Sequence, residues 1–140
     1  MVARGGGSDD SSEGSVDTGV KPTIEVPGEP PPEKLEVEDL VTGDGPEATA
    51  GDQVTVQYVG VDYESGEEFD SSWERPEPFQ FQLGGGMVIK GWDEGVEGMR
   101  VGGRRRLVIP PDLAYGPQGQ PPAIGPNATL VFVIDLISVQ

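Results

Sequence analysis

One helix is predicted in this chain, around the stretch Val88-Ile89-Lys90-Gly91-Trp92-Asp93-Glu94-Gly95. Apolar residues recur at positions 89, 92, 96 and 99, and this spacing of three and four is typical of a short amphipathic helix. We therefore predict a helix over residues 89–99, ended by Gly102-Gly103, with Trp92 just inside its first turn. The helix thus brings a large aromatic ring to the surface on which it packs.

Five further stretches around this helix are predicted to be strands. The clearest, residues 53–59, alternates polar and apolar side chains as a half-buried strand does. Residues 129–137 are apolar on both faces, which predicts a strand at the centre of the sheet. The other strands are predicted at residues 35–41, 79–83 and 104–109. The fold class is therefore α+β, a mainly antiparallel sheet with one helix packed on it.

Three consecutive arginines, Arg104-Arg105-Arg106, open one of these strands. Because side chains alternate across a strand, Arg104 and Arg106 share one face of the sheet. We predict that this face is solvated, with the arginines pairing with surface acids such as Asp93 or Glu94.

The aromatic residues are confined to one part of the chain. All nine lie between Tyr58 and Phe132, and Asp70 stands among them in Phe69-Asp70-Ser71-Ser72. Aromatic rings this concentrated predict an apolar pocket. A carboxylate buried there without a partner is costly, so we predict that Asp70, Trp92 and Tyr115 belong to a binding site rather than to the core alone.

The composition excludes several kinds of site and partner. The chain has no Cys and no His, the residues that most zinc and iron–sulfur sites and histidine-activated nucleophiles require. We expect no metal and no cofactor. The net charge of −16 argues against binding to nucleic acid or to an anionic membrane surface. No stretch approaches the roughly 18 apolar residues of a spanning helix, so we expect no membrane insertion.

The chain divides into three predicted segments. Residues 1–20 are rich in Gly, Ser and acids and are predicted to be a disordered tail. Residues 21–33 contain five prolines and are predicted to be extended, and residues 34–140 form a single domain. Pro30-Pro31-Pro32 could bind an SH3-like partner, but a stiff spacer is favoured because no Arg flanks the prolines.

The cellular compartment has two interpretations. Residues 1–10 lack the apolar core of a signal peptide, which favours a cytoplasmic protein. A Gly/Ser/Asp tail before a compact domain also resembles the spacer of an exported or surface-anchored protein whose leader is missing.

Several motifs in one fixed order resemble a known family. They are Tyr58-Val59-Gly60, Phe69-Asp70-Ser71-Ser72, Pro78-Phe79-Gln80-Phe81, Val88-Ile89-Lys90-Gly91-Trp92, Ala114-Tyr115-Gly116 and Ala128-Thr129-Leu130-Val131-Phe132. From about residue 34 to residue 139 the chain resembles the FKBP family of rapamycin-binding peptidyl-prolyl cis-trans isomerases. The resemblance implies an antiparallel sheet of five or six strands wrapped around one short α-helix, with a pocket between them.

The resemblance also implies the roles of individual residues. Three act on the substrate amide: Asp70, the hydroxyl of Tyr115 and the backbone N–H of Ile89. Seven bind the substrate: Tyr58, Phe69, Phe79, Val88, Trp92, Ile124 and Phe132. Trp92 is the floor beneath the proline ring, Asp70 is hydrogen-bonded towards Tyr58, and Ile124 is the tip of a closing loop. Ala123 and Gly125 flank Ile124 where bulkier residues are common in the family, which predicts a looser loop.

The implied activity is acceleration of X–Pro rotation during protein folding. Such an enzyme works by non-covalent desolvation and by hydrogen bonds to the transition state, and it forms no covalent intermediate. The implied partners are proline-containing polypeptides and macrolide ligands such as rapamycin, and the implied state is a monomer. The alternative is a module that binds proline peptides or macrolides, or a folding chaperone, with little turnover.

Overall fold

The computed structural model describes residues 19–140, and this part of the chain folds into one antiparallel sheet and one short α-helix. Its strands are β1 (Glu36–Val41), β2 (Gln53–Asp62), β3 (Glu68–Ser71), β4 (Phe79–Gln82), β5 (Arg104–Ile109) and β6 (Leu130–Val139). The helix α1 spans Lys90–Gly95, and a 3₁₀ turn spans Pro111–Leu113. The predicted α+β class is confirmed. The tail predicted for residues 1–20 lies almost entirely outside the described residues.

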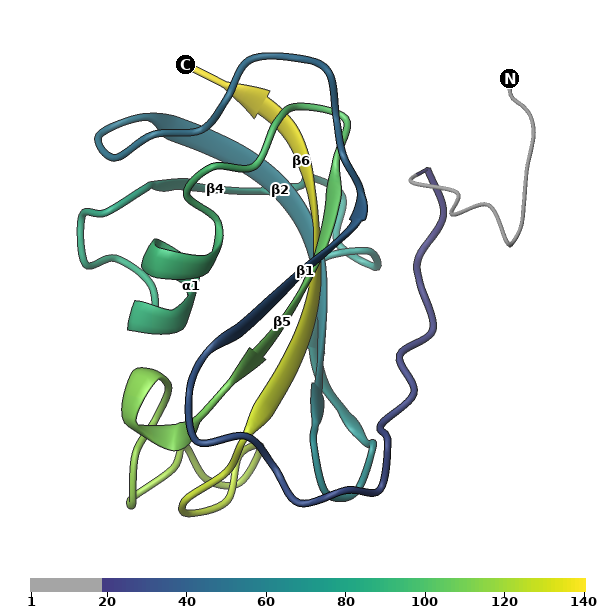
Figure 1. Ribbon diagram of the computed structural model, residues 1–140, viewed down its shortest axis with the longest axis vertical. Helices are drawn as coiled ribbons and strands as arrows, with labels where there is room; N and C mark the ends of the chain where they lie inside the picture. The colour runs from purple at the N-terminus through teal and green to yellow at the C-terminus, as the bar shows by residue number, and fades with distance from the viewer. Residues whose placement is uncertain (1–18) are drawn as a thin grey trace.

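The sheet has the strand order β1-β5-β6-β2-β3, and β4 pairs with the first half of β2. Every pairing is antiparallel. The strand β6 lies in the middle of this order, which confirms the position predicted from its two apolar faces. The sheet curves around α1, which packs on the concave face (Figure 1).

Two glycines bring α1 unusually close to the sheet. A Cβ atom at Gly91 would lie 2.5 Å from Cγ2 of Ile109, and one at Gly95 would lie 2.7 Å from Cδ1 of Leu107. Any larger side chain at these positions would push the helix away from β5. The close approach closes the main core, in which Trp92 and residues of β2, β5 and β6 are buried together.

The helix is shorter than the sequence predicted. It ends at Gly95, with Val96 as C-cap, instead of continuing to Met99. Gly98 adopts a positive φ of 94° and donates its N–H to the carbonyl of Ala48, so the helix cannot continue through it. Val96 and Met99 are still buried in the core, which explains why the apolar spacing runs past the last helical residue.

The prediction for the arginines was right about their faces and wrong about their environment. Arg104 is only 4 % exposed, and its guanidinium forms two hydrogen bonds to the carboxylate of Asp135 at 2.6 and 2.8 Å. Arg105 is also buried and pairs with Asp39. The alternation of β5 gives the face of each side chain correctly, but it does not show what covers that face.

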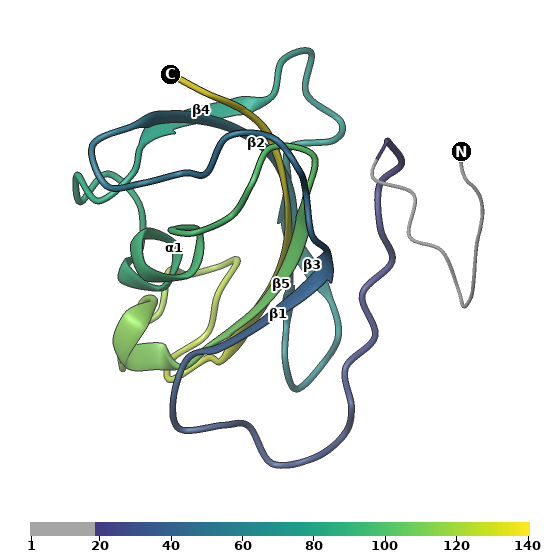
Figure 2. The same cartoon turned by 45° about the horizontal axis from the view of Figure 1, so that its top comes forward.

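Residues 20–32, the N-terminal strap, cover part of the convex face of the sheet (Figures 1 and 2). Ile24 and Val26 pack there against a second apolar cluster, formed by Val61, Tyr63, Val108 and Val131. The Nζ atom of Lys21 pairs with Glu68 at 3.0 Å and with Glu74 at 2.7 Å. The strap contains no helix or strand, so these side-chain contacts hold it on the sheet.

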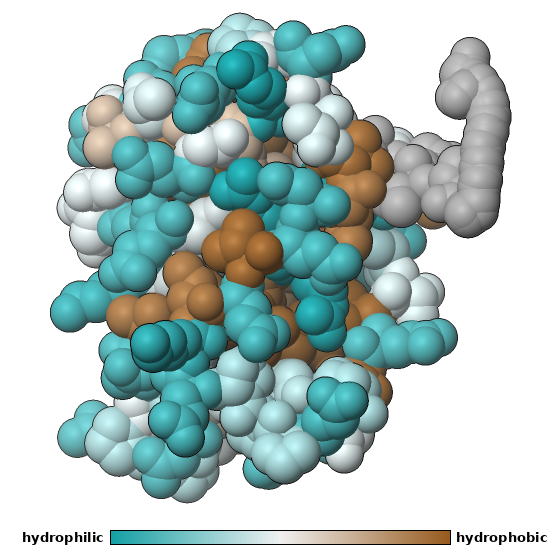
Figure 3. Space-filling view, viewed as in Figure 1, coloured by the Kyte–Doolittle hydropathy of each residue, from teal (hydrophilic) through white to brown (hydrophobic). Residues whose placement is uncertain are grey.

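The remaining surface is mostly polar. Figure 3 shows a mainly hydrophilic face, with apolar side chains gathered between α1 and β1, where the helix meets the sheet. Within residues 19–140, the structure contains no helix with the length and apolarity needed to cross a bilayer.

We expect the strap to be part of the cooperative fold. Replacing both Ile24 and Val26 by Asp should lower the free energy of unfolding by about 2–3 kcal/mol, because full burial of such a side chain contributes about 1.5–3 kcal/mol and these two are half-buried. Urea unfolding measures this loss. The matched control is Val37→Asp, at an exposed position on the edge strand β1, which should change stability by at most about 0.5 kcal/mol. An unchanged midpoint in the double variant would show that the strap does not contribute to stability.

Candidate functional site

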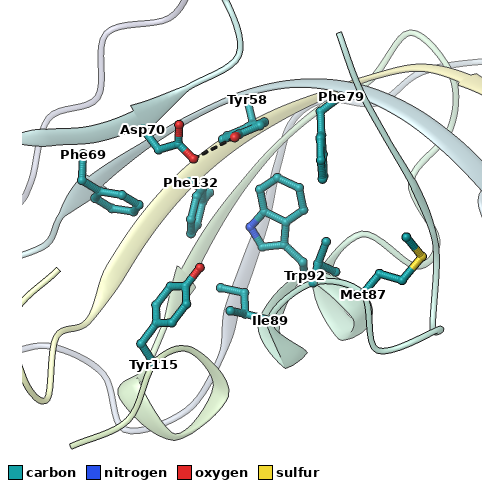
Figure 4. Close-up of a pocket in the computed structure, with 10 residues that line it drawn as sticks. Tyr58, Phe69, Asp70, Phe79, Met87, Ile89, Trp92, Tyr115 and Phe132 are labelled. Carbon is teal, nitrogen blue, oxygen red and sulfur yellow. Dashed lines mark hydrogen bonds between the residues drawn. The ribbon is translucent and has the colours of Figure 1, made fainter. Parts of the chain in front are cut away.

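A cavity of about 210 Å³ opens between α1 and the concave face of the sheet. Figure 4 shows its aromatic walls, with side chains converging from α1 and the loop before it, from the strands β2, β3, β4 and β6, and from the loop that follows β5. The lining residues are Tyr58, Phe69, Asp70, Phe79, Met87, Val88, Ile89, Trp92, Tyr115 and Phe132. The structure thus brings together nine of the ten residues that the sequence predicted for the site.

Trp92 is the centre of this aromatic cluster. It is only 3 % exposed, and its indole ring meets Tyr58 at 4.9 Å and Phe132 at 5.2 Å between ring centroids, both edge to face. Phe79 makes a third edge-to-face contact with it at 6.0 Å. Such geometry matches the charge distribution of the rings and fixes the orientation of the indole. The Nε1 atom of Trp92 is buried and has no hydrogen-bond partner among the described residues.

A polar network borders the apolar cavity. The hydroxyl of Tyr58, on β2, donates to Oδ2 of Asp70, on β3, at 2.8 Å (Figure 4). The guanidinium of Arg75 donates to Oδ1 of Asp70 at 2.7 Å and to the hydroxyl of Tyr58 at 3.1 Å. The Asp70–Tyr58 bond was predicted from the resemblance, but Arg75 was not identified. The only sequence signal for Arg75 was that it is a basic residue five positions after Asp70.

The environment of Tyr58 raises the pKa of its hydroxyl to about 12. Burial is the largest cause, followed by the hydrogen bond to Asp70 and by the charge of Asp70, while Arg75 acts in the opposite direction. The hydroxyl therefore remains a proton donor over the whole neutral range. It keeps the Asp70 carboxylate oriented at the edge of the cavity.

This shift makes a testable prediction for the tyrosine titration. In an ultraviolet titration of the wild type, one tyrosine hydroxyl should ionise near pH 12. This transition should be missing from Tyr58→Phe, and its midpoint should fall to a lower pH in Asp70→Asn. Since the folded protein binds this proton more tightly than the unfolded chain, the stability contribution is full below about pH 10 and is lost as the pH rises towards about 12. A titration completed near the ordinary value of about 10 would contradict this assignment.

Two further donors belong to the cavity lining. The hydroxyl of Tyr115 points into the cavity and forms no hydrogen bond with any residue from 19 to 140 (Figure 4). Burial, and to a smaller extent the charge of Asp70, raises the pKa of Tyr115, so this hydroxyl also keeps its proton. The backbone N–H of Ile89 likewise has no acceptor in the described part of the chain. Both donors are thus available to carbonyl groups of a ligand.

Ile124 is the one predicted site residue that does not line the cavity. Its side chain is 5 % exposed and belongs to the main core. Gln120 and Ile124 exchange two backbone hydrogen bonds of 2.9 Å, which close a tight turn and hold this segment together. The loop is therefore tied internally, although small residues flank Ile124.

Met87 is the lining residue that the sequence did not indicate. Its side chain is 66 % exposed at the mouth of the cavity, and it follows Gly84-Gly85-Gly86 without any motif of its own. The carboxylate of Asp93 accepts the backbone N–H groups of Gly84 and Gly86 at 2.9 and 3.1 Å. The first turn of α1 thereby anchors the loop that leads to Met87.

The comparisons with known proteins agree with this architecture. The model of the FKBP-type peptidyl-prolyl cis-trans isomerase family matches residues 45–137. An FK506-binding protein of Streptomyces anulatus is 56% identical over 120 residues, which cover 85% of this chain and 97% of that protein. A probable FK506-binding protein of Corynebacterium glutamicum is also 56% identical, over 118 residues that cover 84% of this chain and 98% of that protein.

Solved structures show the same relationship. The crystal structure of AtFKBP13 superimposes with a TM-score of 0.70 at 43% sequence identity, over 76% of this chain and 93% of that one. The residues matched by the family model, 45–137, include all ten residues that line the cavity and the helix that carries Trp92. The chain therefore belongs to the FKBP-type peptidyl-prolyl cis-trans isomerase family.

Proposed function

We propose that this protein catalyses cis–trans isomerisation of X–Pro bonds in polypeptides, with the proline ring placed against Trp92. The observation that carries this proposal is the cavity itself, an aromatic pocket of about 210 Å³ with a fixed indole at its centre and one ion pair at its edge. None of the ten lining side chains is a Ser, Cys, Lys or His. The Asp70 carboxylate is held by Tyr58 and Arg75, and the raised pKa values of Tyr58 and Tyr115 keep both hydroxyls protonated, so the cavity is suited to non-covalent chemistry rather than to nucleophilic attack.

Desolvation of the amide supplies one part of the catalysis. Resonance holds the X–Pro bond planar, and the barrier to rotation is roughly 18–20 kcal/mol. The planar amide is more dipolar than the twisted one, so water stabilises the ground state more than the transition state. When the bond moves onto the aromatic surface around Trp92, the ground state loses this preferential stabilisation and the barrier falls.

Hydrogen bonds to the substrate supply the second part. The hydroxyl of Tyr115 and the N–H of Ile89 are unused donors of the cavity lining. We assign them to carbonyl groups of the bound peptide, held in the geometry of the twisted amide. A donor that binds the twisted state better than the planar state lowers the barrier without any proton transfer.

Asp70 provides the negative end of the site. Its carboxylate is held by Tyr58 and Arg75 at 2.8 and 2.7 Å, so it does not need to reorient during the reaction. We assign it to the carbonyl carbon of the rotating bond, which becomes more electron-poor when the twist stops the nitrogen lone pair from conjugating with it. Preorganised charges of this kind act without a reorganisation cost during the reaction.

We also propose that macrolides such as rapamycin bind in the same cavity. The support is the cavity's aromatic lining, together with the names of the relatives, which are FK506-binding proteins. A macrolide that fills the cavity would compete with the proline ring for the face of Trp92.

A protease-free assay of a short Leu-Pro peptide tests the proposed function. We expect a protein-dependent acceleration of the cis-to-trans rate that is lost in folded Asp70→Ala protein, while the exposed control Asp112→Ala keeps its activity. Tight rapamycin binding without acceleration would instead identify a binding module. A folded protein with neither property would show that the cavity has been assigned wrongly.

A further inference from the structure

We propose that Arg105 is a positioning residue that holds the C-terminal end of α1, and through it Trp92, in the arrangement that the cavity needs. The proposal rests on the proposed function and extends it to a residue outside the cavity. Arg105 lies on β5, beside the C-terminal end of α1, and it does not line the cavity.

The guanidinium of Arg105 is buried and makes four hydrogen bonds. The side chain belongs to a residue that is 9 % exposed, and its Nη1 atom donates to the carbonyls of Gly95 and Glu97 at 2.8 and 3.0 Å. Its Nε and Nη2 atoms donate to the carboxylate of Asp39 at 2.7 and 3.3 Å. One side chain thus connects the end of α1 to the edge strand β1 through β5.

The helix needs such support because it is very short. It has six residues, no side-chain cap at Ile89 and no basic residue in its last turn. A helix of this length is not stable by itself, and its last carbonyl groups have no partners within the helix. Arg105 supplies from another strand the donors and the positive charge that the end of the helix lacks.

The position of Arg105 in the strand makes this role specific. Within β5, Leu107 and Ile109 face the main core on the same side as Arg105. Val108 faces the opposite side, where the second apolar cluster lies beneath the strap. A cation at a core-facing position is costly unless it is paired and hydrogen-bonded. A long apolar side chain such as Met could fill the space that Arg105 occupies, but it could not donate hydrogen bonds to the carbonyls of Gly95 and Glu97.

The two ends of α1 are therefore fixed by different groups. Asp93, in the first turn, accepts hydrogen bonds from the loop Gly84-Gly85-Gly86. Arg105, on β5, donates hydrogen bonds both to the last turn and to Asp39 on β1. Trp92 lies between them, and its carbonyl accepts the N–H of Val96 at 2.9 Å. If the end of α1 moves, the indole ring moves with it, and small displacements of positioning groups have large effects on rate.

The test compares Arg105→Met with Arg106→Met on the same strand. Arg106 points away from α1 and is half-exposed, so this variant removes the same charge without touching the helix. For folded Arg105→Met we expect kcat/KM on the Leu-Pro peptide to fall about tenfold and rapamycin to bind more weakly, because a misplaced group costs up to about 100-fold in rate. Arg106→Met should stay within about twofold of the wild type, as surface substitutions usually do.

Two further variants and one ligand-free measurement separate positioning from general destabilisation. Arg105→Lys keeps the positive charge but loses the forked hydrogen-bond geometry of the guanidinium, so its kcat/KM should lie between those of Arg105→Met and the wild type. Asp39→Asn should lower kcat/KM about threefold, because it weakens only the hydrogen bonds that hold the guanidinium from β1. In Arg105→Met the Val96 amide should exchange with solvent faster and the Trp92 indole resonance should shift, with no change at strand amides of β6. If Arg105→Met does not fold, Arg105→Lys and Asp39→Asn carry the test.

The outcomes are distinct. A folded Arg105→Met protein with wild-type kcat/KM, rapamycin affinity and Val96 exchange would overturn the proposal. If the wild-type protein shows no isomerase activity, the proposed function fails, and the Val96 exchange and rapamycin affinity still decide whether Arg105 holds the helix.

Discussion

Trp92→Ala is expected to lower kcat/KM by at least about 100-fold and the free energy of unfolding by about 3–5 kcal/mol. The indole is almost completely buried and makes edge contacts with three other rings, so its removal leaves a cavity in the core and removes the surface on which the proline ring is placed. The loss of stability and the loss of activity thus have the same structural origin. Both are measured on the same preparation, by urea unfolding and by the peptide assay.

Two variants separate the effects on stability and activity. Trp92→Phe keeps an aromatic ring and should retain part of the activity at a smaller cost in stability. Trp73→Phe changes the other tryptophan of the chain, which does not line the cavity, and should leave kcat/KM unchanged. Folded Trp92→Ala protein with wild-type kcat/KM would contradict the assignment of Trp92 as the floor.

Asp135→Ala is expected to destabilise the protein by about 3–5 kcal/mol, because it leaves the buried guanidinium of Arg104 without its carboxylate. Arg104 also donates to the carbonyl of Val20 in the strap, at 2.8 Å. Urea unfolding of the variant measures the cost. A loss below about 1 kcal/mol would show that water or a rearranged partner satisfies the arginine.

The double variant Arg104→Met/Asp135→Leu is the matched control. Burial raises the pKa of Asp135 even though Arg104 favours its charged form, so desolvation outweighs the attraction within the pair. Replacing both charges by apolar side chains of similar size removes that desolvation penalty, and we expect the double variant to be close to the wild type or more stable. A double variant as unstable as Asp135→Ala would contradict this explanation.

Most strands could be predicted because their cause is visible in the sequence. The alternation of residues 53–59 and the uniformly apolar character of residues 129–137 depend only on which face of a strand is buried. The end of α1 could not be predicted in the same way. Val96 and Met99 continue the helical spacing, although Gly98 turns the chain out of the helix to donate to Ala48.

The errors in the site have a similar origin. The fixed order of the family motifs identified the aromatic walls. The burial of Ile124, however, depends on a turn closed by backbone hydrogen bonds. The position of Met87 depends on a loop whose N–H groups bind the carboxylate of Asp93. The environment of Arg104 and Arg105 depends on groups far away in the sequence, the carbonyl of Val20 in the strap and the carboxylate of Asp39 on β1. Tertiary contacts of this kind leave no local pattern.

Titration of the isomerase activity with rapamycin tests most directly whether isomerisation takes place in the cavity around Trp92. At a protein concentration well above the dissociation constant, the acceleration of the Leu-Pro peptide should fall linearly and reach zero at one equivalent of rapamycin. The indole fluorescence of Trp92 should change over the same range, since Trp92 lies in the cavity lining. Isomerase activity that persists when the cavity is saturated with rapamycin would show that the reaction takes place elsewhere on the protein.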